Sequence, residues 1–392
     1  MTMHIARLID RIPDFLKFAE PFTTMQRALS NYFRSHREMG SRDRRMFRSI
    51  VYSNRRLGYS LPLLDEKLRT LIGIYLTGEL DWSSVKEGIE ATPFKEWPSS
   101  DSIADRINQV RLFFTEFREE ALFPFSDLVS PEIELKDFRI SMLVPPKVHI
   151  RIRRGQGSRV EAELARLGIG FHRNVLEGSL SFEQGVDLES LDCFKEGCFE
   201  VQDLSSQFVS AQYAPKAGES WWDVCAASGG KSLGLLDKCD DIALLASDVR
   251  PTILDNLSKR LGKAGLSAVD VQLIDASIEE DVPGAPFDCI IADVPCTGSG
   301  TWARTPERIM QFDTTFVLAH YVPLQKGILR GVTKQLKLGG KVHYSTCSVF
   351  RAENENIVNW MVDTLGYRLV SMNYFSRYFD RADTLFSAIL TR

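Results

Sequence analysis

Asp288-Cys289-Ile290-Ile291-Ala292-Asp293-Val294-Pro295-Cys296-Thr297-Gly298-Ser299-Gly300 is an apolar run that ends in an aspartate, a proline, a cysteine and a glycine-rich turn. The apolar part has the length of a buried strand, and polar residues directly beyond a strand end predict a ligand site. A second apolar run, closed by Tyr344-Ser345-Thr346-Cys347-Ser348, ends in the same way. Two strand ends that each carry a thiol indicate cysteine chemistry. Taken alone, the cysteine of the Pro-Cys pair is a candidate nucleophile.

The chain around these two runs alternates regularly between strand-like and helix-like segments from about residue 200 onward. Such alternation predicts an α/β domain with a parallel sheet covered by helices on both faces. In such sheets ligands bind beyond the carboxyl ends of the strands. The expected strands are Trp221–Cys225, Ala243–Ser247, Val269–Ile274, Phe287–Ala292, Lys341–Ser345, Tyr367–Met372 and Thr384–Leu390.

The segments before residue 200 have a different character, so we expect three domains: 1–130, 131–200 and 201–392. The first is expected to be a helical bundle, because its apolar residues recur at helical spacing after candidate caps at Ser41 and at Asp101 or Ser102. The second is expected to be a small α+β module, since Val148–Arg153 alternates like a strand and a short helix follows it.

Composition excludes several classes of protein. The chain of 392 residues has strand-sized apolar runs, so we expect no membrane span, and its first ten residues lack a signal-peptide core. Seven cysteines without paired CxxC motifs favour reduced thiols in the cytoplasm over a disulfide scaffold. The six scattered histidines show no HExxH spacing, so no metal is expected.

The net charge of −4 is unevenly distributed. Residues 1–60 hold twelve lysines and arginines, from Arg7 to Arg56, against five acidic residues. A basic region on a mildly acidic protein indicates an anionic partner such as RNA, although a solvated helix surface or a protein-binding module fits the charge as well. The expected arginine-dense face of the helical bundle consists of Arg42, Arg44, Arg45, Arg48, Arg55 and Arg56.

The turn after the first strand of the α/β domain, Asp223-Val224-Cys225-Ala226-Ala227-Ser228-Gly229-Gly230-Lys231-Ser232, leads into a helix. Its glycines let backbone amides approach a ligand, and the helix start favours an anionic group. A P-loop is disfavoured, because that motif needs glycine where Cys225 stands. Asp248, Asp275 and Asp293 end the next strands. Each is a candidate helix cap, but together they favour a nucleoside-like ligand.

These motifs together resemble the RsmB/NOP/Sun family of RNA cytosine-5 methyltransferases, most closely the bacterial RsmB/Sun ribosomal RNA enzymes. The resemblance rests on residues 223–232, 293–301 and 344–348, and also on 201–207 and 353–355. It implies a Rossmann-like S-adenosylmethionine-dependent methyltransferase domain, a small RNA-contacting module before it, and a NusB-like RNA-binding helical domain at the front. The chain departs from the family pattern at Ser228, where proline is usual, at Arg351, where proline is common, and at Ile152-Arg153, where Val-Asn is usual.

The resemblance also implies roles for site residues. Cys347 would attack C6 of the cytosine, Cys296 would assist proton loss or product release, and Asp293 would hydrogen-bond the base. The residues implied for S-adenosyl-L-methionine are Cys225, Ala226, Ala227, Ser228, Gly229, Gly230, Lys231, Asp248, Arg250, Asp275 and Asp293.

Other functions remain open at this stage. Ribosomal RNA is favoured as the substrate and transfer RNA is the alternative. An inactive RNA-binding assembly factor with the same fold is a second hypothesis. A DNA cytosine methyltransferase would use the Pro-Cys nucleophile, but it would lack the Thr346-Cys347-Ser348 cysteine and the basic helical front. The remaining thiols, Cys193, Cys198, Cys239 and Cys289, are expected to be small buried hydrophobes.

Overall fold

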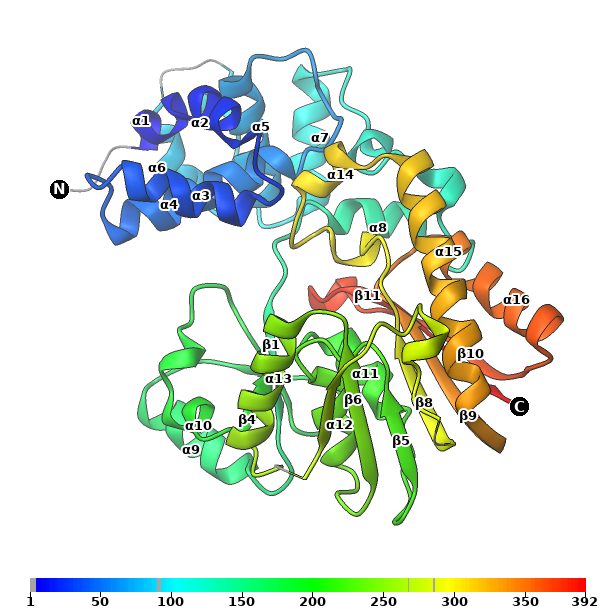
Figure 1. Cartoon of the computed structure of the whole chain (residues 1–392). Coiled ribbons are helices and arrows are strands. Elements are labelled where there is room, and N and C mark those ends of the chain that lie inside the picture. Colours follow the sequence, from blue (N-terminus) through cyan, green and yellow to red (C-terminus); the bar gives the residue numbers. More distant parts are fainter. Residues whose placement is uncertain (1–4, 90–92, 267, 285) are drawn as a thin grey trace. The chain divides into compact units, whose positions relative to one another are not determined.

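The computed structural model describes residues 5–89, 93–266, 268–284 and 286–392, and the chain forms two compact units (Figure 1). The helical unit runs from the N-terminal end to Asp127 and adds Glu134–Pro145 and Trp302–Phe312. The α/β unit comprises Leu128–Ile133, Pro146–Thr301 and Asp313–Arg392. The sequence did not indicate that Trp302–Phe312, which directly follow the first cysteine turn, pack with the helical unit.

The helical unit is built from short amphipathic helices with defined starts. Thr24, Asp65, Asp81 and Ser102 each accept a hydrogen bond from a first-turn amide, so Ser102 is the cap that was predicted for its helix. The cap predicted at Ser41 is wrong by one residue, because Gly40 is the N-cap and its helix has no side-chain cap. The helices are α1 Ile5–Asp10, α2 Ile12–Ala19, α3 Met25–Ser35, α4 Ser41–Arg55, α5 Glu66–Thr77, α6 Trp82–Glu87, α7 Ile103–Phe113, α8 Leu135–Ser141 and α14 Glu307–Gln311.

One arginine of the expected basic face is buried. Arg56 is 3% exposed, and its Nη1 donates to the carbonyl oxygens of Met142 at 3.0 Å and Ala303 at 2.7 Å. Its guanidinium therefore ties three separate parts of the chain together within the helical unit. The prediction that Arg56 lies on the surface face is wrong, whereas Arg42, Arg45 and Arg48 are exposed.

Helices α4 and α5 approach each other closely at Gly73. A Cβ atom on Gly73 would lie 2.3 Å from the carbonyl oxygen of Ser53 and 2.7 Å from its carbonyl carbon. Because backbone atoms cannot move aside as a flexible side chain does, this crossing requires glycine.

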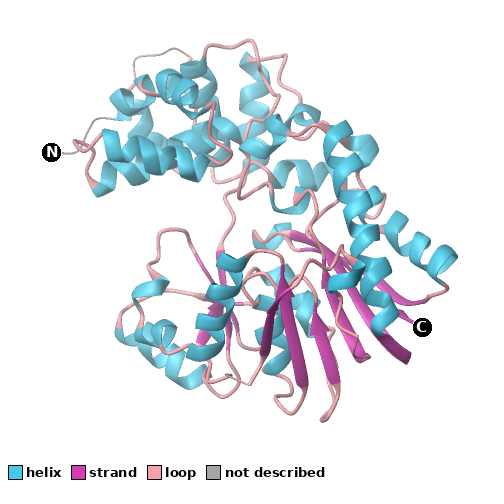
Figure 2. Ribbon diagram, viewed as in Figure 1, coloured by secondary structure: helices cyan, strands magenta, loops and turns pink. Residues whose placement is uncertain are grey.

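The α/β unit holds a seven-stranded sheet, shown as the large group of arrows in Figure 2. Its strand order is β10-β11-β9-β8-β5-β6-β7. The run from β9 to β7 is parallel, and β11 is antiparallel to both of its neighbours. The predicted Rossmann-like α/β fold is confirmed. The strands are β5 Ser220–Asp223, β6 Ala243–Asp248, β7 Asp270–Leu273, β8 Phe287–Asp293, β9 Leu336–Thr346, β10 Arg368–Ser376 and β11 Thr384–Thr391.

Successive side chains along a strand point to opposite faces of the sheet, and each face is covered by its own apolar core. Trp221 faces the core formed with α11 (Leu204–Ala211), α12 (Gly230–Leu236) and α13 (Pro251–Lys263). Its neighbour Trp222 faces the opposite core, which includes residues of α15 (Thr314–Val332) and α16 (Glu355–Leu365). This period of two is what a strand buried on both faces requires.

A second, four-stranded antiparallel sheet has the order β2-β3-β1-β4 and precedes the large sheet along the chain. Its strands are β1 Val148–Ile152, β2 His172–Arg173, β3 Ser179–Phe182 and β4 Phe199–Val201, and the helices α9 Gly157–Arg166 and α10 Asp192–Lys195 accompany them. This matches the expected small α+β module. No helix in the described part of the chain is long and apolar enough to cross a membrane.

Gly73→Ala is expected to destabilise the helical unit by about 1–3 kcal/mol, because the added methyl group must push α5 away from the Ser53 carbonyl. Hydrogen–deuterium exchange of the α4 and α5 amides should become faster, and exchange in the seven-stranded sheet should not change. The matched control is Gly262→Ala in α13, where a Cβ would meet no atom within 4 Å and alanine favours the helix. Unchanged exchange in α4 and α5 of the Gly73 variant would contradict the close crossing.

Candidate active site

The two predicted thiols meet at the carboxyl ends of adjacent strands. Cys296 follows β8 and Cys347 follows β9, and these strands pair in parallel with Asp293 opposite Ser345. The two Sγ atoms lie 3.4 Å apart. The contact with the Cys347 thiol and burial raise the pKa of Cys296 well above its ordinary value, so Cys296 is held as a thiol.

A buried carboxylate holds the two cysteine turns together. Glu353 is fully buried; its Oε1 accepts from the Thr297 amide at 2.9 Å, and its Oε2 accepts from the hydroxyls of Thr297 at 2.6 Å and Ser348 at 2.5 Å. Thr297 directly follows one cysteine and Ser348 directly follows the other. Burial raises the pKa of Glu353, and these hydrogen bonds offset only part of that effect.

Asp293 ends β8. It contacts the loop of residues 225–231, which is predicted to bind the cofactor and is called the cofactor loop below. Its Oδ1 accepts from the Ser345 hydroxyl at 2.7 Å, and its Oδ2 pairs with Lys231 Nζ at 2.5 Å. Burial alone would lower the pKa of Lys231, but the charge and hydrogen bond of Asp293 outweigh it and the pKa is raised. Asp293 therefore connects the predicted base-binding position to the predicted cofactor loop.

Asp248 ends β6 and is nearly buried. Its oxygens accept from the Ala227 amide at 3.1 Å and, in a fork, from Arg250 Nε at 2.8 Å and Nη2 at 2.9 Å. Burial would raise the pKa of Asp248, but the hydrogen bonds and charge of Arg250 keep the pKa below its ordinary value. The structure thus brings Asp248, Arg250 and the cofactor loop together at the end of one strand.

Asp275 lies in the loop after β7 and accepts from its own local turn. Its Oδ1 takes hydrogen bonds from the Ser277 amide at 3.0 Å and the Ser277 hydroxyl at 2.6 Å. This is the capping arrangement that an aspartate adopts in a turn. It leaves the second carboxylate oxygen, Oδ2, outside these two bonds.

Asp223 is a site-forming residue that the sequence reasoning did not single out. It ends β5, is fully buried, and accepts from the Ser232 hydroxyl at 2.6 Å through Oδ2, while Oδ1 has no hydrogen-bond partner within the described structure. Burial raises its pKa to about 7. Its place at a strand end just before the glycine turn was a signal that could have identified it, as was the motif position of Glu353.

The remaining thiols separate into two groups. Cys193, Cys198 and Cys289 are buried, as expected for small hydrophobes. Cys239 is only partly buried, so that expectation is wrong for it, and Cys225 is also partly exposed. Among the residues that the structure describes, no three histidine, cysteine or acidic side chains are grouped so that they could hold a metal ion.

Comparisons with known proteins concern first the fold and then the sequence. The fold matches a crystal structure of PH0851, with 20% identity and a TM-score of 0.67 over 100% of both chains. It also matches NSun6 from Pyrococcus horikoshii solved with SFG, with 18% identity and a TM-score of 0.59 over 72% of this chain and 96% of that one. These likenesses show a shared Rossmann-like α/β fold.

The sequence comparison shows which family a part of the chain resembles. Residues 211–380 match the family described as 16S rRNA methyltransferase RsmB/F, so this region of the chain is similar to that family. The ribosomal RNA small subunit methyltransferase B of Shewanella oneidensis is 32% identical over 216 residues, which are 55% of this chain and 50% of that protein. The chain spans about half the length of the curated relatives it matches.

Mild oxidation with diamide is expected to link Cys296 to Cys347. Their Sγ atoms, 3.4 Å apart, need to approach by only about 1.4 Å to reach the length of a disulfide, and diamide takes up the two hydrogens that are lost. Mass spectrometry of proteolytic peptides would show the linked pair 2 Da lighter than the two thiol peptides together. Cys347→Ser is the control.

Two Glu353 variants sharpen this experiment. Glu353→Ala removes the shared acceptor of Thr297 and Ser348 and should slow the linkage, while the isosteric Glu353→Gln should slow it less. A disulfide that joins Cys296 to Cys225 instead would contradict the adjacency of the two strand-end thiols.

Asp223→Asn is expected to become more stable relative to wild type as the pH rises from about 4 to about 7. The folded-state pKa of about 7 lies above the ordinary 3.8, so the unfolded chain releases this proton first and wild type loses folding free energy over that interval. Urea unfolding midpoints at pH 4.5, 6 and 8 measure the difference. Asp255→Asn, at an exposed position of α13, is the control, and a pH-independent difference for Asp223→Asn would refute the assignment.

Proposed function

We propose that this chain transfers a methyl group from S-adenosyl-L-methionine to C5 of a cytosine in RNA, with ribosomal RNA as the substrate. The observation that carries the proposal is the pair of thiols 3.4 Å apart at the ends of β8 and β9, next to Asp293. The family match over residues 211–380 supports methyl transfer to RNA, and the Shewanella oneidensis relative is itself a ribosomal RNA methyltransferase.

The chemistry of cytosine explains why two thiols would be needed. C5 is a weak nucleophile, so the Cys347 thiolate adds to C6 and makes C5 electron-rich. When bound, S-adenosyl-L-methionine supplies the methyl group to that carbon. The C5 proton then leaves, and the electrons of its bond re-form the C5–C6 double bond as the bond from C6 to Cys347 breaks.

Cys296 would serve the second half of this sequence. Its Sγ is in contact with that of Cys347, and it is held as a neutral thiol, which suits a group that assists proton loss or release rather than the first attack. Asp293 would hydrogen-bond N3 or the exocyclic amine of the base, which stabilises the charge that develops on the ring. The target base must leave any stack to enter this pocket.

The residues at the ends of β5 and β6 fit the cofactor. Asp248 is nearly buried and anchors the Ala227 amide, so its carboxylate is placed to accept from ribose hydroxyls. The backbone of residues 225–231 would hold the methionine part, with Lys231 near its carboxylate, and Asp275 would accept from the adenine amine. Arg250, which forks onto Asp248, would orient that carboxylate.

Two other functions use the same fold: methylation of transfer RNA, and RNA binding without catalysis. The meeting of Cys296 and Cys347, together with Asp293, favours catalysis over binding alone. The basic residues of the helical unit that remain exposed, including Arg42, Arg45 and Arg48, supply charge for a structured RNA. We propose that the helical unit and the small sheet make those contacts.

Methyl transfer from labelled S-adenosyl-L-methionine to total RNA tests the proposal. Wild type should label RNA and Cys347→Ala should not, because it lacks the attacking thiol. Cys296→Ala should leave a protein–RNA adduct that survives denaturing electrophoresis, because release is impaired. Bisulfite sequencing of the labelled RNA identifies the cytosine and distinguishes ribosomal from transfer RNA.

Two results would change the proposal. An adduct that forms in Cys347→Ala and is lost in Cys296→Ala would reverse the roles of the two thiols. Absence of transfer to every RNA by a folded wild-type protein would favour the binding-factor alternative. Cys193→Ala, at a buried thiol away from the strand ends, is the matched control and should label RNA as wild type does.

A further inference from the structure

The cofactor loop holds a strained backbone turn. Ala227 has a φ of 47° and Gly229 a φ of 84°, on either side of Ser228. A residue with a side chain costs about 1–2 kcal/mol in this left-handed region, and such a conformation persists only where its surroundings fix it. The resemblance described from the sequence implies proline at the position of Ser228, where a ring would restrict the backbone by itself. Serine has no such restriction.

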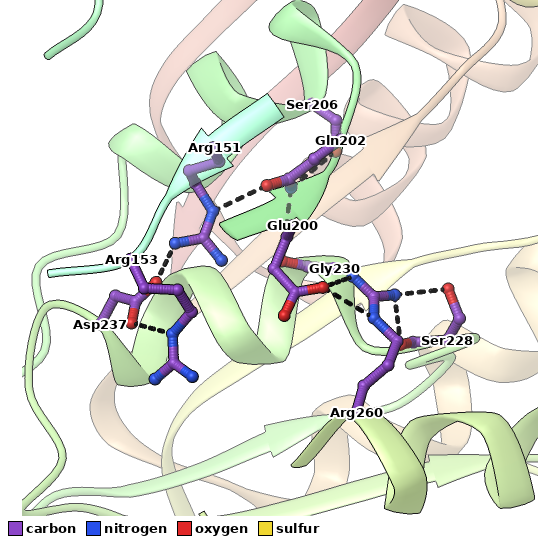
Figure 3. Close-up of polar contacts among 9 residues, drawn as sticks. All are labelled: Arg151, Arg153, Glu200, Gln202, Ser206, Ser228, Gly230, Asp237 and Arg260. Carbon is purple, nitrogen blue, oxygen red and sulfur yellow. Dashed lines mark hydrogen bonds and ion pairs between the residues drawn. The ribbon is translucent and has the colours of Figure 1, made fainter. Parts of the chain in front are cut away.

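A partly buried ion pair contacts this turn directly. Arg260 of α13 donates through Nη1 to the Ser228 carbonyl oxygen at 2.6 Å and to its hydroxyl at 2.9 Å, as Figure 3 shows. The same guanidinium donates through Nε and Nη2 to Oε2 of Glu200 at 2.9 Å and 2.5 Å. Glu200 lies on β4 of the small sheet and is 5% exposed.

The other end of the turn is held from the same place in the chain. Gln202, two residues after Glu200, donates from Nε2 to the Gly230 carbonyl oxygen at 3.3 Å and to the Ser206 hydroxyl at 3.2 Å (Figure 3). Its Oε1 accepts from Arg151 Nε on β1 at 2.8 Å. Two side chains at the end of β4 therefore reach both flanks of Gly229, one of them through Arg260.

We propose that Arg260, oriented by Glu200, is a positioning residue that holds the cofactor loop in the place of the proline ring. The inference rests on the proposed cofactor function of this loop. The fork geometry requires arginine, because one planar guanidinium binds the Ser228 oxygens on one edge and the Glu200 carboxylate on the other, which a lysine ammonium cannot do. The Ser228 amide makes no hydrogen bond in the described structure, so proline at this position would remove no donor.

The alternative is that Arg260 and Glu200 only pack the small sheet against α13. The two roles differ in one respect. If Arg260 fixes the turn, then Ser228→Pro should make Arg260 dispensable, whereas proline at 228 cannot replace a packing contact between β4 and α13.

The test measures cofactor affinity and loop exchange in the chain of 392 residues without RNA. Titration calorimetry with S-adenosyl-L-methionine should show that Arg260→Met weakens binding about tenfold or more, as expected for charge-assisted hydrogen bonds that are lost. Arg260→Lys should be intermediate. The double variant Ser228→Pro/Arg260→Met should return to within about threefold of wild type. Lys259→Met, an exposed neighbour on α13, is the matched control and should bind as wild type does.

Hydrogen–deuterium exchange over residues 226–232 provides a readout that needs no ligand. Exchange should rise in Arg260→Met and fall back in the double variant. Unchanged affinity and exchange in Arg260→Met, or a folded double variant no better than Arg260→Met, would overturn the inference. If wild type binds no S-adenosyl-L-methionine, the proposed function fails instead, and the exchange pattern alone decides the role of Arg260.

Discussion

The parallel pairing of β8 with β9 is the constraint on which the site depends. Once Asp293 lies opposite Ser345, the residues that follow each strand emerge at the same edge of the sheet, and the thiols of Cys296 and Cys347 come within 3.4 Å. Glu353 then joins the two turns by accepting hydrogen bonds from the residue after each cysteine. A shift of β9 by one residue would turn its side chains to the other face of the sheet and separate the residues that now lie side by side.

Buried carboxylates are the second common element of the site. Asp223, Asp248 and Glu353 are each less than 5% exposed, and each is held by hydroxyl, amide or guanidinium donors. Their pKa values diverge because their partners differ. Arg250 keeps the pKa of Asp248 low. Burial raises the pKa values of Asp223 and Glu353, because their hydroxyl donors offset only part of its effect. One edge of the sheet therefore holds one acid with a lowered pKa and two acids with raised pKa values.

The turn at Ser228 is held by a side chain from a distant part of the chain. Proline restricts the backbone through a covalent ring, whereas Ser228 is held by Arg260, which comes from a helix 32 residues later and is oriented by Glu200. The turn keeps its left-handed residues on both sides. Because contacts from outside hold this strained turn, the cofactor loop is joined to the small sheet. The small sheet and the large sheet of the α/β unit therefore share one polar network.

The amino-acid sequence alone predicts the helices and strands and the kinds of side chain at the strand ends. Hydrophobic periodicity located the seven strands of the large sheet, and the polar residues beyond them marked Asp248, Asp293, Cys296 and Cys347, because these signals are local in the chain. Which residues from distant segments lie in contact follows only from the packing of the folded chain. The strand order that puts β8 beside β9, the burial of Arg56, the reach of Glu353 to both cysteine turns and that of Arg260 to Ser228 all join residues distant in sequence. No local pattern encodes such pairings, because they arise only when the packed sheet and helices bring separate segments together.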